Sequence, residues 1–181
     1  DTSPASLTWT IDSVPPDTAI LSVTDGKETR LNAGENTSSN LAKATFAGND
    51  TGGAGVEHLE CSLDGASFTV CTSPLQLTPE NLTDRTHIFK VISEDKSANK
   101  DPSPASFNWT VDTMPPITTV NTAVDGNNSS ITNGSSTESK TITIGFSGND
   151  TDGVGVEHLE CSLDGTSFTV CTSPVQLSPT N

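Results

Sequence analysis

Apolar and polar side chains alternate along most of this chain, and Pro, Gly, Asn and Asp interrupt the alternation about every 8–12 residues. The clearest run is residues 105–111, where Phe107, Trp109 and Val111 occupy every second position before a Pro-Pro pair. A period of two is typical of a strand with one buried face, and no window shows the stripe of an amphipathic helix. The pattern predicts an all-β chain.

The same alternation predicts further strands. They cover residues 19–23, 41–46, 56–63, 68–71 and 86–93, and the third and fourth of them form a hairpin. In the last of these strands His87, Phe89 and Val91 take the inward positions. The core predicted from these strands contains Phe46, Leu59, Leu63, Phe89, Val91 and Trp109.

The chain also repeats itself. A shift of 100 residues aligns it with itself without a gap, and 45 of the 81 aligned positions are identical. Residues 48–74 recur almost unchanged as 148–174, whereas residues 17–45 differ most. About 100 residues is a common size for one domain and typical of an immunoglobulin-type sandwich. The prediction is therefore an all-β fold of tandem immunoglobulin-like or fibronectin-III-like β-sandwich repeats.

The Pro-Pro pairs predict the domain boundaries, because Pro cannot donate to a strand ladder and restricts the residue before it. Residues 1–14 would be the closing strand of a preceding repeat, 15–114 a complete repeat, and 115–181 a repeat lacking its last two strands. The simplest explanation is a slice of a longer polypeptide. The alternative is that a neighbouring chain donates the missing strands, which the absence of two strands rather than one makes less favourable.

Four cysteines form two identical C-x9-C spacings, Cys61 with Cys71 and Cys161 with Cys171. In the predicted hairpin, a loop over residues 64–68 would place Cys61 directly opposite Cys71, close enough for a disulfide. Zinc is the competing use of cysteine pairs, but its usual C-x2-4-C spacing is not present. Disulfides favour an extracellular location, either at the cell surface or secreted.

The composition limits the partners. The net charge is −15, which disfavours nucleic acid and anionic membrane surfaces and either keeps a long array soluble or attracts cations. No stretch approaches the roughly 20 apolar residues of a membrane helix, so no membrane insertion is expected within this segment. Glycosylation sequons, expected on exposed positions, are present at Asn36, Asn49, Asn81, Asn108, Asn127, Asn128, Asn133 and Asn149.

Oxygen-bearing side chains gather in two predicted loops, 49–51 and 94–101. Asp50, Asp95, Asn99 and Asp101 are the candidate calcium ligands, near the linker residues Asp12 and Asp17. The alternative is that Asp and Asn serve only their own turns, and Lys96 and Lys100 dilute the charge. No cofactor is required, and Ca²⁺ is the one ion that the pattern suggests.

No catalytic constellation is recognisable in the sequence. The complete repeat holds only His58 and His87, with His87 predicted to tie a corner loop to its strand and His58 to face solvent beside Glu57 and Glu60. The glycine-rich stretch 52–55 has no following helix or Lys to hold a phosphate. The chain is therefore predicted not to be an enzyme.

Residues 59–74 and 86–116 carry a C-SLDG-…-C-SP hairpin, an H-x-F-x-V strand, a D-x-x-x-N-x-D-P-x-P-A loop and a W-T-V-D-T-x-P-P exit. These motifs resemble the immunoglobulin-like repeats of large prokaryotic surface and secreted proteins. The resemblance implies a β-sandwich strung in tandem as stalks, adhesins or envelope layers. The chain departs from it at residues 81–85, where a Leu-x-Asp-Gly turn is usual.

The leading functional hypothesis is a structural repeat region of a large extracellular surface protein, forming a rod, filament or envelope layer. Its partners would be neighbouring repeats of the same protein and identical chains in a filament or lattice. The alternatives are adhesin repeats that bind a surface ligand through positions such as Ile88 and Ile92, or a spacer module of a secreted carbohydrate-active enzyme.

Overall fold

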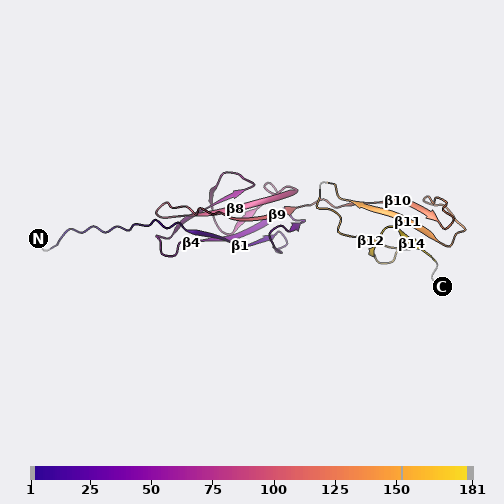
Figure 1. Ribbon diagram of the computed structural model, residues 1–181, viewed down its shortest axis with the longest axis horizontal. Coiled ribbons are helices and arrows are strands. Elements are labelled where there is room, and N and C mark those ends of the chain that lie inside the picture. The colour runs from indigo at the N-terminus through magenta and orange to yellow at the C-terminus, as the bar shows by residue number, and fades with distance from the viewer. Residues whose placement is uncertain (1–2, 152, 179–181) are drawn as a thin grey trace. The chain divides into compact units, whose positions relative to one another are not determined.

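The computed structural model describes residues 3–151 and 153–178. Every regular element in these ranges is a β-strand, so the all-β prediction is correct, and no helix is present there that could span a membrane. The chain divides into two compact units, Asp1–Thr113 (unit 1) and Met114–Asn181 (unit 2). Each unit is described by itself below, and Figure 1 labels the strands for which there is room.

Unit 1 contains two sheets. The first has the order β2-β1-β4-β7, with all neighbours antiparallel. Its strands are β1 (Asp17–Asp25), β2 (Arg30–Leu31), β4 (Ala42–Asn49) and β7 (Leu75–Leu77). The second has the order β3-β9-β8-β5-β6, in which only the β3–β9 pair is parallel. Its strands are β3 (Asn36–Thr37), β5 (Val56–Leu63), β6 (Thr69–Cys71), β8 (Arg85–Asp95) and β9 (Ala105–Val111).

The core of unit 1 lies between these two sheets, as in a β-sandwich. Phe46 of the first sheet meets Phe89 of the second with ring centroids 5.6 Å apart, and Val91 and Trp109 are fully buried in the same cluster. These four residues were all predicted core positions. Leu59 and Leu63 were predicted there too; they are partly buried and pack against this cluster.

The predicted strands agree closely with the observed ones where the alternation is long. β5 and β9 have the predicted bounds, and His87, Phe89 and Val91 of β8 all face inward. The short strands β2, β3 and β7 were missed, because two or three residues cannot display a period of two.

Both disulfides are present, with Cα atoms 5.8 Å apart in each. The predicted register was wrong, however, because Leu59 lies opposite Cys71 and Cys61 lies opposite Thr69. The chain reverses more tightly than expected, through Asp64 (φ 54°) and Gly65 (φ 80°), with the Ala66 N–H donating to the Leu63 carbonyl. Left-handed backbone at both positions suits the Asp-Gly pair. The disulfide therefore joins diagonal neighbours.

Removing the first disulfide with Cys61→Ser/Cys71→Ser is expected to lower the free energy of unfolding of unit 1 by roughly 3 kcal/mol, because the unfolded chain regains loop entropy. Urea unfolding followed by Trp109 fluorescence, in a Trp9→Phe background, measures this. The matched variant Cys161→Ser/Cys171→Ser should leave the unit 1 transition in place. Equal effects of the two double variants on that transition would contradict the prediction.

Unit 2 has a three-stranded sheet, β10-β11-β14, and a two-stranded sheet, β12-β13. The strands are β10 (Ile117–Asp125), β11 (Ile142–Asn149), β12 (Leu159–Cys161), β13 (Thr169–Cys171) and β14 (Val175–Leu177). The β10–β11 register runs from Ile117↔Asn149, as β1–β4 runs from Asp17↔Asn49, and both pairs have a register shift after four residues. β12 has three residues against the eight of β5, and it pairs with β13 as the corresponding part of β5 pairs with β6.

The end of β1 is closed by the carboxylate of Asp25, which accepts hydrogen bonds from the Lys27 and Thr29 N–H groups and the Thr37 hydroxyl. Burial alone would raise the pKa of Asp25, but these hydrogen bonds outweigh it and hold the pKa below its usual 3.8. Asp125 at the end of β10 repeats the arrangement, and its pKa is lowered chiefly by the Thr137 hydroxyl.

Acid should therefore destabilise both units. A carboxylate whose pKa is lower in the folded state contributes stability that is complete above the unfolded value, near 3.8, and is lost as the pH falls through the folded value. Urea unfolding of unit 1 between neutral pH and about pH 2 is expected to show this loss. Asp25→Asn should reduce the slope of the free energy of unfolding of unit 1 against pH, whereas Asp125→Asn should leave that slope unchanged. The same slope in Asp25→Asn as in the unsubstituted chain would contradict the stabilising role of the Asp25 carboxylate.

Candidate cation site

The loop after β8 is organised around Asp95, whose side chain is almost completely buried. Its Oδ1 accepts hydrogen bonds from the N–H groups of Ser97 (2.7 Å) and Asn99 (2.9 Å), and its Oδ2 accepts one from Asn99 Nδ2 at 2.8 Å. Burial would raise the pKa of Asp95, but the Asn99 and Ser97 bonds outweigh it and lower the pKa. Asp95 is therefore held as a carboxylate.

A second carboxylate follows β4. Asp50 Oδ2 accepts a hydrogen bond from the Gly55 N–H at 2.7 Å, while Oδ1 is enclosed and has no hydrogen-bond partner among the described residues. A Cβ atom at Gly53 would collide with this carboxylate, so the turn requires glycine there. Asp150 and Gly153 of unit 2 have the same relationship. The glycine-rich stretch 52–55 therefore leaves room for the Asp50 carboxylate and donates a hydrogen bond to it.

The third carboxylate comes from the segment before β1. Asp12 Oδ1 accepts a hydrogen bond from the Val14 N–H, and Oδ2 accepts one from the Ala54 N–H at 2.6 Å. The Asp12 carbonyl accepts a further bond from Asn99 Nδ2 at 3.3 Å. Asp12 thus joins its own segment to both the 50–55 loop and the 95–99 loop.

Asp12, Asp50 and Asp95 each place one carboxylate oxygen within 4.8 Å of the other two. No Lys, Arg or His forms an ion pair with any of them in the part of the chain that the structure describes. Three like charges at this separation repel one another, and oxygen ligands are those that hard cations prefer. We call these three residues the Asp12 cluster.

The Asp12 cluster contains some of the predicted calcium ligands and not others. Asp50 and Asp95 are in it, and Asn99 borders it as a hydrogen-bond donor. Asp101 is buried elsewhere, with its Oδ1 accepting bonds from the Ser103 N–H and hydroxyl. Asp17 lies in β1 opposite Asn49 and is not part of the group.

Comparison with known proteins gives no match, either to a family model, to a curated protein or to a solved structure. The function must therefore be argued from the chain's own residues.

The two histidines of unit 1 differ in their surroundings. His87 is completely buried, and its Nδ1 and Nε2 form hydrogen bonds with Asp64 Oδ2 and the Thr83 carbonyl, both at 2.8 Å. His58 was expected beside Glu57 and Glu60. Glu60 is indeed its neighbour, but the second neighbour is Glu94, which lies opposite His58 on β8, because adjacent residues of a strand point to opposite faces of the sheet.

All predicted glycosylation positions are exposed. They are Asn36, Asn49, Asn81, Asn108, Asn127, Asn128, Asn133 and Asn149. At Asn49 the hydroxyl of the sequon residue Thr51 donates a hydrogen bond to the Asn side-chain oxygen at 2.8 Å. Their accessibility is consistent with modification, which stays a prediction.

Proposed function

We propose that this chain is part of a tandem array of immunoglobulin-like β-sandwich repeats in a large extracellular surface protein, where the repeats form a rod, filament or envelope layer. The observation that carries the proposal is the recurrence of the sequence after 100 residues without a gap. Strand pairing supports it, because β10, β11 and β14 pair with the same offsets as β1, β4 and β7.

The residues that recur are chiefly those that build the fold. They include the Asp-Gly turn, the cysteine pair and the Asp50–Gly53 turn, each found again 100 residues later. Two disulfides also fit an oxidising extracellular environment. Repetition of fold-building residues favours a mechanical or spacing role over a single specific site.

The adhesin alternative has less support. It was based on exposed apolar strand positions such as Ile88 and Ile92, and Ile88 is indeed 43% exposed. Ile92, however, is only 8% exposed, so the two do not form a surface together. A spacer role beside a catalytic domain depends on sequence outside this chain.

Electron microscopy of the intact parent protein on its native surface tests the structural proposal. We expect a regular rod, filament or lattice with a periodic repeat along it. Irregular monomers without any periodic assembly would contradict the filament and lattice forms. A parent chain with few repeats beside a catalytic domain would favour the spacer role.

Calcium binding by the Asp12 cluster would stiffen such an array, because Asp12 joins the preceding segment to two loops of unit 1. We expect saturating Ca²⁺ to raise the free energy of unfolding of unit 1 by about 1–3 kcal/mol at ten to a hundred times its Kd. Asp12→Asn should abolish the gain, whereas Asp17→Asn, an exposed neighbour outside the cluster, should keep it. Thermal unfolding with Ca²⁺ and with a chelator measures both, and identical curves for the unsubstituted chain would contradict calcium binding.

A further inference from the structure

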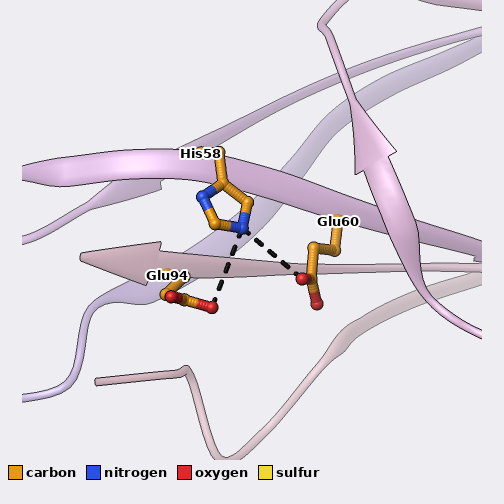
Figure 2. Close-up of side chains that lie close together, drawn as sticks. All are labelled: His58, Glu60 and Glu94. Atoms are coloured by element: carbon orange, nitrogen blue, oxygen red, sulfur yellow. Dashed lines mark hydrogen bonds and ion pairs between the residues drawn. The ribbon is translucent and has the colours of Figure 1, made fainter. Parts of the chain in front are cut away.

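A second group of metal-ligating side chains lies on the surface of the larger sheet of unit 1, away from the Asp12 cluster. His58 of β5 lies opposite Glu94 of β8, and Glu60 follows His58 by two residues on the same face. Figure 2 shows the three side chains converging on one point. Their ligand atoms all lie within 4.8 Å of one another. Two paired strands therefore hold a nitrogen ligand and two oxygen ligands together.

The separations match those of a coordination shell. His58 Nε2 lies 3.4 Å from Glu60 Oε1 and 3.7 Å from Glu94 Oε2. Tetrahedral bonds of about 2.0–2.1 Å to zinc put neighbouring ligand atoms about 3.3–3.4 Å apart. Small side-chain rotations would therefore bring all three atoms to bonding distance of one ion. An imidazole with two carboxylates suits zinc and similar transition metals, whereas Ca²⁺ and Mg²⁺ prefer oxygen ligands alone.

We propose that His58, Glu60 and Glu94 bind a divalent transition-metal ion of the zinc class on the face of unit 1. The side chains are 28%, 15% and 20% exposed, so the site is open to solvent while its ligands are held by the sheet. A water molecule would complete the coordination of the ion, as in other zinc sites with three protein ligands.

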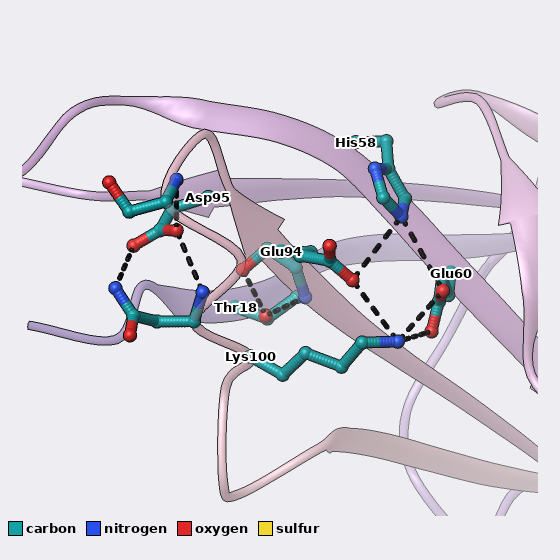
Figure 3. Close-up of polar contacts among 9 residues, drawn as sticks. Thr18, His58, Glu60, Glu94, Asp95 and Lys100 are labelled. Carbon is teal, nitrogen blue, oxygen red and sulfur yellow. Dashed lines mark hydrogen bonds and ion pairs between the residues drawn. The ribbon is translucent and has the colours of Figure 1, made fainter. Parts of the chain in front are cut away.

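Lys100 would compete with the metal ion for the carboxylates of Glu60 and Glu94. Its Nζ lies 2.9 Å from Glu60 Oε2 and 3.2 Å from Glu94 Oε2. Figure 3 shows the Lys100 side chain reaching both carboxylates. In the absence of a metal, the single positive charge of the ammonium group offsets part of the negative charge of the two carboxylates. Because the Lys100 side chain is 49% exposed, it can turn into solvent when an ion takes over its role. The metal and the ammonium group therefore bind the same two carboxylates in turn.

Unit 2 carries only part of the arrangement. His158 Nε2 lies 3.5 Å from Glu160 Oε1, and both side chains are about half exposed. No position in this chain corresponds to Glu94 or Lys100 in unit 2, since 194 and 200 exceed its length. Unit 2 thus provides a two-ligand control within the same molecule.

Zinc titration of the full 181-residue chain tests the proposal, by calorimetry and by following the imidazole NMR signals. We expect one equivalent of Zn²⁺ to bind and the NMR signals of the His58 imidazole to shift on binding. His58→Ala should lower the affinity for zinc by at least about tenfold. Lys100→Met should tighten binding about fivefold, the order expected when a surface ion pair no longer has to be displaced. His158→Ala should bind as the unsubstituted chain does.

Further variants distinguish loss of the zinc ligands from unfolding of unit 1 and from zinc binding at the Asp12 cluster. Glu94→Gln keeps the shape of the side chain and should weaken zinc binding, while Trp109 fluorescence verifies that unit 1 remains folded. Asp50→Asn should leave zinc binding unchanged. The proposal would be overturned if His58→Ala bound zinc as tightly as the unsubstituted chain, if Lys100→Met gave no tightening, or if Asp50→Asn abolished binding, which would move the ion to the Asp12 cluster.

Discussion

Replacing Trp109 by Ala is expected to lower the free energy of unfolding of unit 1 by about 3–5 kcal/mol. The indole is completely buried between the two sheets and packs against His87 and Phe107, with ring centroids 5.8 and 6.2 Å away. Its Nε1 has no hydrogen-bond partner among the described residues, so the loss comes from packing and from the cavity left behind. Urea unfolding followed by hydrogen exchange of the β8 amides measures the effect.

Trp9→Ala is the matched control for this substitution. Trp9 occupies the same position in the repeat, 100 residues earlier, but its side chain is 75% exposed. Its replacement should change the stability by no more than about 0.5 kcal/mol, as is usual for exposed positions. Losses of similar size in the two variants would show that Trp109 is not the centre of the core.

Replacing Asp64 by Ala is expected to lower the free energy of unfolding of unit 1 by about 1–3 kcal/mol, the cost of leaving a buried hydrogen-bonding group without a partner. Asp64 Oδ2 forms a hydrogen bond with His87 Nδ1 at 2.8 Å, and Asp64 Oδ1 accepts a hydrogen bond from the Ile88 N–H at 2.9 Å. His87 is fully buried, so removal of the carboxylate leaves its ring nitrogen without a partner. The contact with Arg85, whose side chain is 57% exposed, contributes little.

Asp164→Ala is the control that distinguishes loss of the Asp64 side-chain hydrogen bonds from loss of an Asp that favours the turn conformation. Asp164 has the same left-handed backbone, φ 53° against 54°, and the same following glycine. Its side chain is exposed and forms no hydrogen bond or ion pair with the described residues. Both variants lose the preference of Asp for this conformation, but only Asp64→Ala loses the contacts to β8. Urea unfolding is followed by Trp109 fluorescence for unit 1 and by backbone amide NMR signals for unit 2. The loss of stability should be larger for Asp64→Ala in unit 1 than for Asp164→Ala in unit 2, and equal losses would assign the effect to the turn.

Much of the fold was predictable because the strongest signals are local. The alternation in residues 105–111 and 56–63 predicted β9 and β5 with their observed bounds. The C-x9-C spacing predicted the pairing of the cysteines, since a short hairpin brings such positions together. Register was not predictable in the same way, because it depends on whether the turn closes at Asp64–Gly65 or over a longer loop.

The candidate sites were predictable only in part. The Asp and Asn residues of the 95–99 loop were visible in the sequence, but the membership of the Asp12 cluster depends on how a separate segment meets two loops. The partners of His58 were less visible still. Glu94 and Lys100 lie 36 and 42 positions further along the chain than His58. The β5–β8 register brings Glu94 to His58, and the bridge between Glu94 and Lys100 brings Lys100 to the same carboxylates.

The sequence by itself determined the strand-forming segments, the pairing of the cysteines, the 100-residue recurrence and the inward faces of the long strands. These depend on residue spacing within a segment or on self-similarity, and both can be read along the chain. The tertiary structure alone decided the diagonal position of the disulfide, the third carboxylate of the Asp12 cluster, the partners of His58 and the burial of Ile92. Each of these depends on which strand or loop lies beside another, and side-chain contacts between distant segments follow from strand register rather than from local pattern.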